Sequence, residues 1–175
     1  MRTTDRLVLR PFRDSDLEPW VAMNTDPEVM KYLGGKPLSP EESERITVGV
    51  NKRYESDGIG FLAIERRSDG AFLGACGLQH EPWYPDDMEL GWRLAREYWG
   101  HGYATEAASS WMAYGFTELD LPRIISITDT PNERSIAVMR RLGMSFDHAA
   151  ELEEDGDTFE AVIYSITPEA WRIAQ

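Results

Sequence analysis

The feature that most constrains the fold is a strand that runs through two glycines into a helix and then into a second strand. Residues 88–95 alternate between apolar and polar side chains, which predicts a strand, and Gly100-His101-Gly102 follows. Small and apolar residues at helical spacing predict a helix over 103–119, and 123–128 is a short β-branched strand. A strand–helix–strand crossover pairs its strands in parallel, so this stretch requires a sheet covered by helices.

The rest of the chain adds antiparallel strands to this unit. Alternating or β-branched runs bounded by turn residues predict strands over 6–10, 61–66, 71–78, 144–152 and 158–166. Helix starts are predicted at Asp14, at the capping box Ser39-Pro40-Glu41-Glu42 and at Asn132. Residues 81–86 are expected to be a loop. We therefore expect an α/β (α+β) sheet that is partly antiparallel, with 88–95 and 123–128 as the parallel pair.

Composition limits the class of protein. The chain has 175 residues, which predicts one domain spanning 1–175, and its net charge of −13 argues against binding to nucleic acid. It contains neither an apolar run long enough to span a membrane nor the apolar middle of a signal peptide, so we expect a cytoplasmic protein with no membrane partner. Cys76 is the single cysteine, which excludes an intrachain disulfide and a cysteine-rich zinc site. We expect no metal.

The glycine turn is a candidate anion site. A helix start offers unpaired N–H groups and the positive end of the helix dipole, and glycines let a diphosphate approach the backbone. A dinucleotide fingerprint would place Gly or Ala where Thr105 stands and an acidic residue about 20 residues on, whereas Asp129 lies farther along. An NTPase loop would need Gly-Lys-Ser/Thr, which is absent. Coenzyme A and a plain tight turn remain as interpretations.

The run from Tyr98 to Ala107, YWGHGYATEA, resembles the acetyl-CoA signature of the GNAT superfamily of N-acetyltransferases. More narrowly, it is similar to the branch that includes the ribosomal-protein N-terminal (RimJ/RimL-type) acetyltransferases. The opening TDRLVLRP, the strand GACGL at 74–78 and the helix motif NERSIAVMRRLGM at 132–144 also resemble that branch. The similarity covers essentially the whole chain in order.

The resemblance implies a GNAT fold, with a mostly antiparallel sheet of about seven strands, a splayed parallel pair and flanking helices. It implies acetyl-CoA as co-substrate, with the pyrophosphate on backbone groups of the glycine turn and the pantetheine beside the strand at 88–95. The implied cofactor contacts are Leu94, Arg96, Trp99, Gly100, His101, Gly102, Tyr103, Ala104, Asn132 and Ser135. The chain departs from the pattern at Glu97, where the superfamily has Gln or Arg, and at Met139, where many relatives have a tyrosine that protonates the thiolate.

Acetyl transfer to an amine needs a base, because an ammonium group has no lone pair, and it needs a donor to the departing thiolate. Glu89 is the candidate base, since a partly buried glutamate in that strand could have a raised pKa; a salt bridge with Arg93 is the alternative. Ser135 is the candidate partner of the thiolate, or an ordinary first-turn serine. Asn132 could be a helix cap, a cofactor contact or both.

The acceptor is a primary amine, which could belong to a protein N-terminus or to a small molecule. Trp20, Trp83 and Tyr84 could line its pocket, because the corresponding segments border the active site in the family that the chain resembles. A domain that binds acyl-CoA without turnover, as a sensor or degenerate subunit, is the alternative function. The sequence is compatible with a homodimer and does not decide the oligomeric state.

Overall fold

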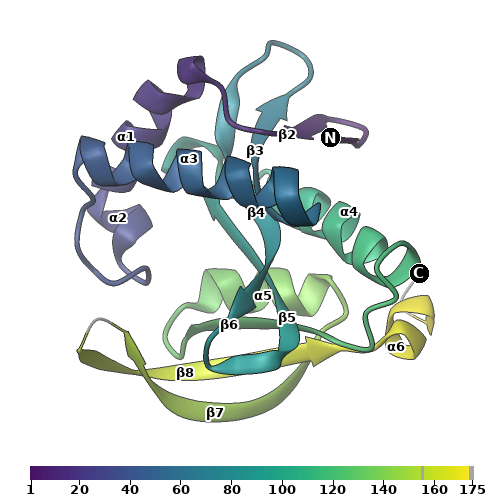
Figure 1. The fold of residues 1–175 in the computed structure, drawn as a ribbon. Coiled ribbons are helices and arrows are strands. Elements are labelled where there is room, and N and C mark those ends of the chain that lie inside the picture. Colours follow the sequence, from purple (N-terminus) through teal and green to yellow (C-terminus); the bar gives the residue numbers. More distant parts are fainter. Residues whose placement is uncertain (155, 174–175) are drawn as a thin grey trace. The chain divides into compact units, whose positions relative to one another are not determined.

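The structure is a computed structural model that describes residues 1–154 and 156–173. Its strands are β1 Arg2–Thr3, β2 Leu7–Arg10, β3 Gly60–Arg66, β4 Phe72–Glu81, β5 Tyr84–Leu94, β6 Ile124–Asp129, β7 Ser145–Glu154 and β8 Asp157–Ile166. Its helices are α1 Leu17–Thr25, α2 Pro27–Met30, α3 Pro40–Asp57, α4 Tyr103–Thr117, α5 Glu133–Arg141 and α6 Pro168–Ile173, with 3-10 turns η1 Asp14–Asp16 and η2 Arg96–Tyr98 (Figure 1).

The sheet topology confirms the predicted mixture of antiparallel and parallel pairing. The hydrogen-bonded strand order is β1-β2-β3-β4-β5-β6-β8-β7. β5 and β6 pair in parallel around Met88–Ile124 and Glu89–Ile125, whereas β6–β8 and β8–β7 are antiparallel. The crossover through α4 therefore connects a parallel pair, as the strand–helix–strand pattern requires.

The chain divides into two compact units, and the division falls inside β4, β5 and α4. One unit comprises Met1–Gly77 and Trp92–Ser110, and the other comprises Leu78–Gly91 and Trp111–Gln175. The expectation of a single domain spanning 1–175 stays a prediction.

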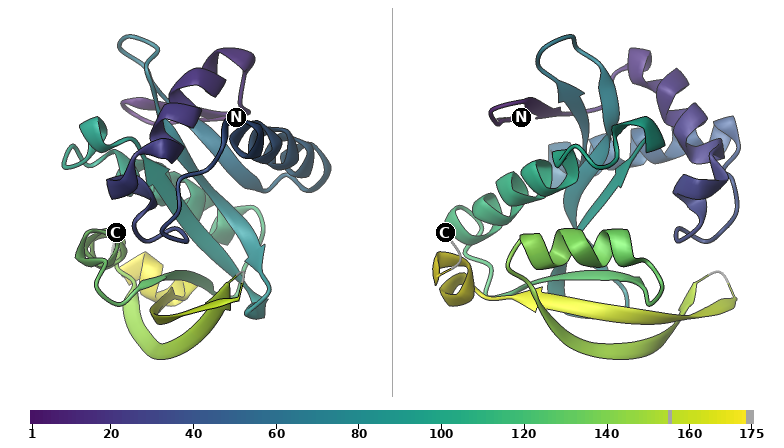
Figure 2. Two further views of the ribbon diagram at one scale, coloured as in Figure 1. Left: turned by 90° about the vertical axis from the view of Figure 1, so that its left-hand side faces the viewer. Right: turned by 180° about the vertical axis from the view of Figure 1, so that it is seen from behind.

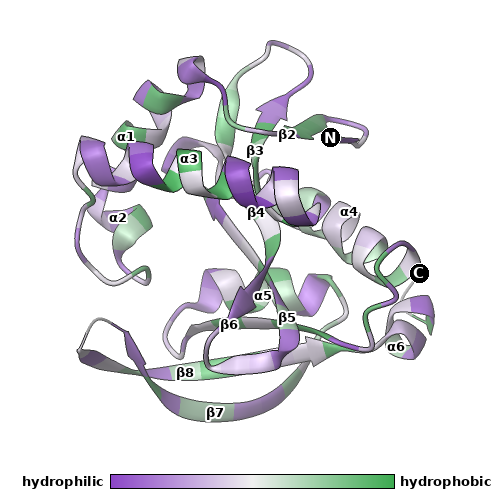
Figure 3. Cartoon of the chain, viewed as in Figure 1, coloured by the Kyte–Doolittle hydropathy of each residue, from purple (hydrophilic) through white to green (hydrophobic). Residues whose placement is uncertain are grey.

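The first unit packs helices on the sheet that begins with β1, β2 and β3. Figure 1 shows α3 crossing β3, and Figure 3 shows hydrophilic and hydrophobic segments alternating along α3, as one buried face requires. The capping box predicted at Ser39 is confirmed: its hydroxyl accepts the Glu42 N–H at 3.1 Å, while Glu42 accepts the Ser39 N–H at 2.7 Å. The buried cluster of this unit comprises Phe12, Trp20, Met23, Val29, Ala63 and Ala75.

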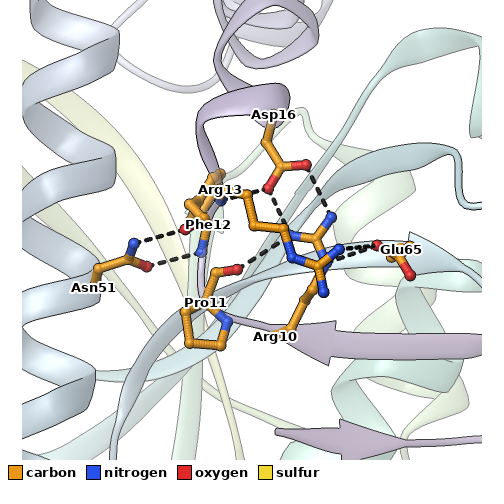
Figure 4. Close-up of polar contacts among 7 residues, drawn as sticks. All are labelled: Arg10, Pro11, Phe12, Arg13, Asp16, Asn51 and Glu65. Atoms are coloured by element: carbon orange, nitrogen blue, oxygen red, sulfur yellow. Dashed lines mark hydrogen bonds and ion pairs between the residues drawn. The ribbon is translucent and has the colours of Figure 1, made fainter.

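The start of α1 differs from the prediction that Asp14 caps it. Asp14 opens the 3-10 turn η1, and Asp16 accepts the Arg13 N–H at 2.8 Å. Asp16 also binds the Arg10 guanidinium through two hydrogen bonds of 2.6 and 2.9 Å (Figure 4). Asp16 takes this place because its carboxylate reaches the buried guanidinium of Arg10 at the end of β2. The spacing of residues along the chain does not predict this contact.

The second unit is a sheet with one helix on it. Figures 1 and 2 show α5 lying along one face of the sheet that β6, β8 and β7 form. Inward side chains of β6, β7 and β8 make its cluster, with Ile125, Leu152, Ala161 and Ile163 at most 9% exposed. The predicted hairpin 144–166 is confirmed, with a register shift between Phe146 and His148.

The expected loop at 81–86 is wrong, because β5 begins at Tyr84 and not at Met88. Pro85, Asp86 and Asp87 have low strand propensity, which made this segment resemble a loop. Tyr84 instead packs against the cluster of the second unit, and its hydroxyl shares a hydrogen bond of 2.8 Å with His148 Nε2. These tertiary contacts extend the strand. The two-residue β1, also not predicted, brings the sheet to eight strands.

Candidate active site

The glycine turn lies in the first unit, between η2 and the first residue of α4. Gly100 and Gly102 both have φ of +79°, a left-handed conformation that favours glycine. Nothing stands within 4 Å of the position that a Cβ of Gly100 would occupy. The turn thus leaves its backbone open in front of a helix start, where N–H groups lack partners within the helix. The geometry leaves room for an anion, and the binding of a diphosphate at this turn stays a prediction.

An arginine that the sequence analysis did not single out holds this turn. Arg6 Nη1 donates to the His101 carbonyl at 3.0 Å, Arg6 Nε donates to Glu106 Oε2 at 2.6 Å, and the guanidinium lies 4.7 Å from the centre of the Tyr103 ring. Glu106 Oε1 accepts from the Thr4 hydroxyl at 2.6 Å and from the Arg6 backbone N–H at 2.8 Å. Burial alone would raise the pKa of Glu106, but the hydrogen bonds from Thr4 and Arg6 hold it below its ordinary value.

Arg6→Ala is expected to weaken acetyl-CoA binding without unfolding the protein. The Arg6 side chain is 49% exposed, so its ion pair contributes little to stability, but its loss frees the His101 carbonyl and the turn. We expect a dissociation constant roughly fivefold higher, about 1 kcal/mol, measured by calorimetry. Arg45→Ala, at an exposed position on α3, is the matched control and should leave binding unchanged. Equal affinities for Arg6→Ala and wild type would contradict this role.

The other predicted cofactor residues of the first unit have internal partners. The Leu94 carbonyl accepts a hydrogen bond from Trp99 Nε1 at 2.8 Å, which ties the end of β5 to the residue before the glycines. Arg96 forms an ion pair of 3.1 Å with Asp26 and is 61% exposed. A largely exposed arginine can exchange such a partner for a phosphate at small cost. Tyr103 is 9% exposed, so it can offer its backbone more readily than its ring.

Glu89 lies in the second unit, on β5, in a polar environment made by β4. Gln79 Nε2 donates to Glu89 Oε2 at 2.9 Å and also donates to Glu81. Burial and then the nearby Glu81 charge raise the pKa of Glu89 to about 8. A carboxyl group with that pKa can accept a proton near neutral pH.

Arg93, the alternative partner proposed for Glu89, binds residues of the first unit. Its Nη1 donates to Asn24 Oδ1 at 2.8 Å, and its guanidinium lies 5.4 Å from the centre of the Trp20 ring. These contacts favour a role for Arg93 in ordering α1. Trp20 itself is 3% exposed and its Nε1 donates to the Ser43 carbonyl at 3.1 Å, which favours packing over contact with an acceptor.

The candidate residues of α5 lie at its start. Asn132 is the N-cap, as predicted, and its Oδ1 accepts the Ser135 N–H at 3.3 Å. Asn132 Nδ2 also donates to Thr128 Oγ1 at 2.8 Å, so both ends of the amide are used within the second unit. Ser135 is half-buried, and its backbone N–H is the donor in this cap. Met139, where the resemblance implies a tyrosine in many relatives, is fully buried.

Trp83 and Tyr84 lie at the turn between β4 and β5. Trp83 Nε1 donates to the Glu153 carbonyl at 3.1 Å, and its ring packs edge-on against Phe159. The Tyr84 hydroxyl is hydrogen-bonded to His148, whose Nδ1 lies 2.9 Å from Asp147 Oδ2. These contacts tie the turn to β7 and β8, and both aromatic residues are partly buried.

Cys76 bears on the choice between direct transfer and a covalent intermediate. Burial raises the pKa of the Cys76 thiol well above its ordinary value, so the thiolate needed for a covalent intermediate is disfavoured. Within residues 1–154 and 156–173 the structure contains no cluster of three or more side chains suited to a metal ion. No helix in the same described ranges is long and apolar enough to cross a membrane.

Comparison with known proteins decides the family. The family described as acetyltransferase (GNAT) domain matches residues 6–145. The chain belongs to the GNAT family. It is 35% identical over 146 residues to the Bacillus subtilis protein YkkB, covering 82% of this chain and 84% of that protein. It is 32% identical over 180 residues to the FsC-acetyl coenzyme A-N(2)-transacetylase of Aspergillus fumigatus, covering 96% and 76% of the two chains.

The branch suggested by the sequence motifs has the same fold. RimL, the ribosomal L7/L12 alpha-N-protein acetyltransferase solved in complex with coenzyme A, superposes with a TM-score of 0.79. That match covers 97% of this chain and 98% of RimL at 18% identity, which shows a shared fold. As a GNAT protein, the chain is an acetyl-CoA-dependent N-acetyltransferase that acts on an amine.

Proposed function

We propose that this GNAT enzyme transfers the acetyl group directly from acetyl-CoA to a primary amine in a ternary complex, with Glu89 as the general base. The observation that carries the proposal is the environment of Glu89. A partly buried carboxyl group on β5, hydrogen-bonded by Gln79 and beside Glu81, has its pKa raised to about 8. A base is most effective when its pKa lies near the working pH.

The glycine turn supports the co-substrate half of the proposal. Backbone groups from Trp99 to Ala104 would bind the pyrophosphate, with Arg6 holding the turn in place. Arg96 would add positive charge beside the pyrophosphate once its ion pair with Asp26 breaks. Leu94 would offer its backbone to the pantetheine, and Asn132 would contact the cofactor through its cap.

In the proposed transfer the acceptor nitrogen gives up two protons, a carbon–nitrogen bond forms and the carbon–sulfur bond breaks. Glu89 accepts a proton from the acceptor ammonium, either directly or through a water molecule, which frees the nitrogen lone pair. The amine nitrogen bonds to the thioester carbon, the carbon–sulfur bond breaks, and the nitrogen loses a second proton as the amide forms. The sulfur leaves as a thiolate, to which the Ser135 hydroxyl donates a hydrogen bond until the thiolate takes up that second proton and becomes free coenzyme A thiol.

A positively charged primary amine fits the acceptor side. The net charge of −13 attracts positively charged molecules before they contact the protein. Tyr84 begins the strand that carries Glu89 and Trp83 directly precedes it, so these two partly buried aromatic residues are the proposed acceptor contacts. A protein N-terminus and a small-molecule amine both satisfy these requirements, and a screen of amine acceptors separates them.

The proposal is tested by titrating the purified protein with acetyl-CoA in a calorimeter, with acetate and ATP as controls. We expect saturable binding of acetyl-CoA and no comparable binding of the controls. Release of free thiol is then measured with peptides, polyamines, amino sugars and amino acids as acceptors. Binding without turnover of any amine would favour the acyl-CoA sensor, and no binding by folded protein would contradict the proposal.

A further inference from the structure

We propose that Gln79 and Glu81 are positioning residues of the acetyl transfer, forming with Glu89 a unit in which one amide holds two carboxyl groups. This inference rests on the proposed role of Glu89 as base. It assigns a task to two residues of β4 that no sequence motif of the chain marks.

The geometry centres on one nitrogen atom. Gln79 Nε2 donates to Glu89 Oε2 at 2.9 Å and to Glu81 Oε1, so its two hydrogens serve two carboxyl groups. Gln79 and Glu81 are two residues apart on β4, so their side chains share a face of the strand. Glu89 is on β5. All three side chains are partly buried, which limits the screening of their charges by water.

The surroundings favour a proton on Glu89. Glu81 is the charged group that acts on Glu89 from β4, and β6 faces Glu89 with the backbone N–H of Ile127. The nearby Glu81 charge repels a negative charge on Glu89, so the protonated form of Glu89 is favoured. The ionised form of Glu89 takes the proton from the acceptor, and no covalent bond to carbon changes in that transfer.

The two positioning residues act on Glu89 in opposite directions. The Glu81 charge raises the pKa of Glu89, whereas the hydrogen bond from Gln79 lowers it, because that bond stabilises the carboxylate. Glu81→Gln should therefore move the rising limb of the pH–rate profile to lower pH. Gln79→Met keeps the length of the side chain but removes the donor, so it should move that limb to higher pH.

The test compares pH profiles of kcat and kcat/KM for wild type, Glu81→Gln and Gln79→Met. One amine acceptor is used throughout, so its own ionisation is the same in every profile. We expect displacements of about one pH unit, downward for Glu81→Gln and upward for Gln79→Met. Glu160→Gln, which removes an exposed charge from β8, is the control and should leave the profile in place.

A second measurement observes the carboxyl groups directly. Carbon-13 NMR of glutamate-labelled protein, with Glu89→Gln used to assign the Glu89 signal, gives the titration of Glu89 in each variant. The titration of Glu89 should move to lower pH in Glu81→Gln and to higher pH in Gln79→Met, even if a variant turns over slowly. The positioning role would be overturned if the titration of Glu89 stayed in place, or moved in the same direction, in both variants. With Glu89→Gln inactive, that result would leave Glu89 as the base. Full activity of Glu89→Gln would instead remove the proposed base itself.

Discussion

Replacing Glu89 with glutamine is expected to lower kcat by about 10²- to 10⁴-fold, the usual contribution of a general base. Glutamine keeps the size of the side chain and its ability to hydrogen-bond with Gln79, but it cannot accept a proton at neutral pH. The dissociation constant for acetyl-CoA should stay unchanged, because the glycine turn that is proposed to bind it lies on other residues. Initial rates of thiol release and calorimetric titration measure the two quantities.

The same variant should be more stable than wild type in alkaline solution. Burial and the Glu81 charge raise the pKa of Glu89 from 4.5 to about 8, so the folded state binds a proton that the unfolded state has lost. The stability of wild type therefore falls as the pH rises from about 4.5 to about 8 through this group. Glutamine removes that dependence. Thermal unfolding at pH 5 and pH 9 should show wild type losing more stability than Glu89→Gln.

Two outcomes would contradict this assignment. Unchanged turnover of Glu89→Gln would exclude Glu89 from proton transfer, and a rate that falls only because acetyl-CoA no longer binds would indicate a structural effect. Glu160→Gln serves again as the control, since it removes one exposed carboxylate and should leave both rate and binding as they are.

Local patterns were sufficient to predict most of the fold. The capping box at Ser39, the cap at Asn132 and the glycine turn at 100–102 each depend on neighbours within a few residues. The start of β5 was missed because its strand character comes from partners on β7 and β8, such as His148, and not from the sequence of Tyr84 to Asp87.

The candidate site also contains some residues that the sequence predicts and others that it does not. Glu89 could be proposed from its place in an alternating strand and from the resemblance to GNAT enzymes. Its partners could not, because Gln79 meets Glu89 only when β4 and β5 are in register. Arg6 and Glu106 are 100 residues apart, and their contact follows from the way the first strands lie against the start of α4. The spacing of residues along the chain does not predict such contacts.

Removing the Asp16 carboxylate is expected to cost about 3–5 kcal/mol of unfolding free energy. Arg10 is 3% exposed and donates to both Asp16 oxygens, at 2.6 and 2.9 Å, as Figure 4 shows. Its remaining partners are Glu65, at 2.7 Å, and the Pro11 carbonyl, at 3.1 Å. The hydrogen bonds with Asp16 raise the pKa of Arg10, so the guanidinium stays charged. Asp16→Ala leaves that buried charge half-compensated.

Urea unfolding of Asp16→Ala beside Asp14→Asn measures this cost. Asp14 lies on the same 3-10 turn but is exposed, so its substitution should change the unfolding free energy by less than about 0.5 kcal/mol. A double variant, Arg10→Met with Asp16→Ala, should recover part of the loss, because it removes the unpaired charge together with its partner. If the double variant were as unstable as the sum of the single variants, the loss would come from packing at the start of α1 and not from the buried charge.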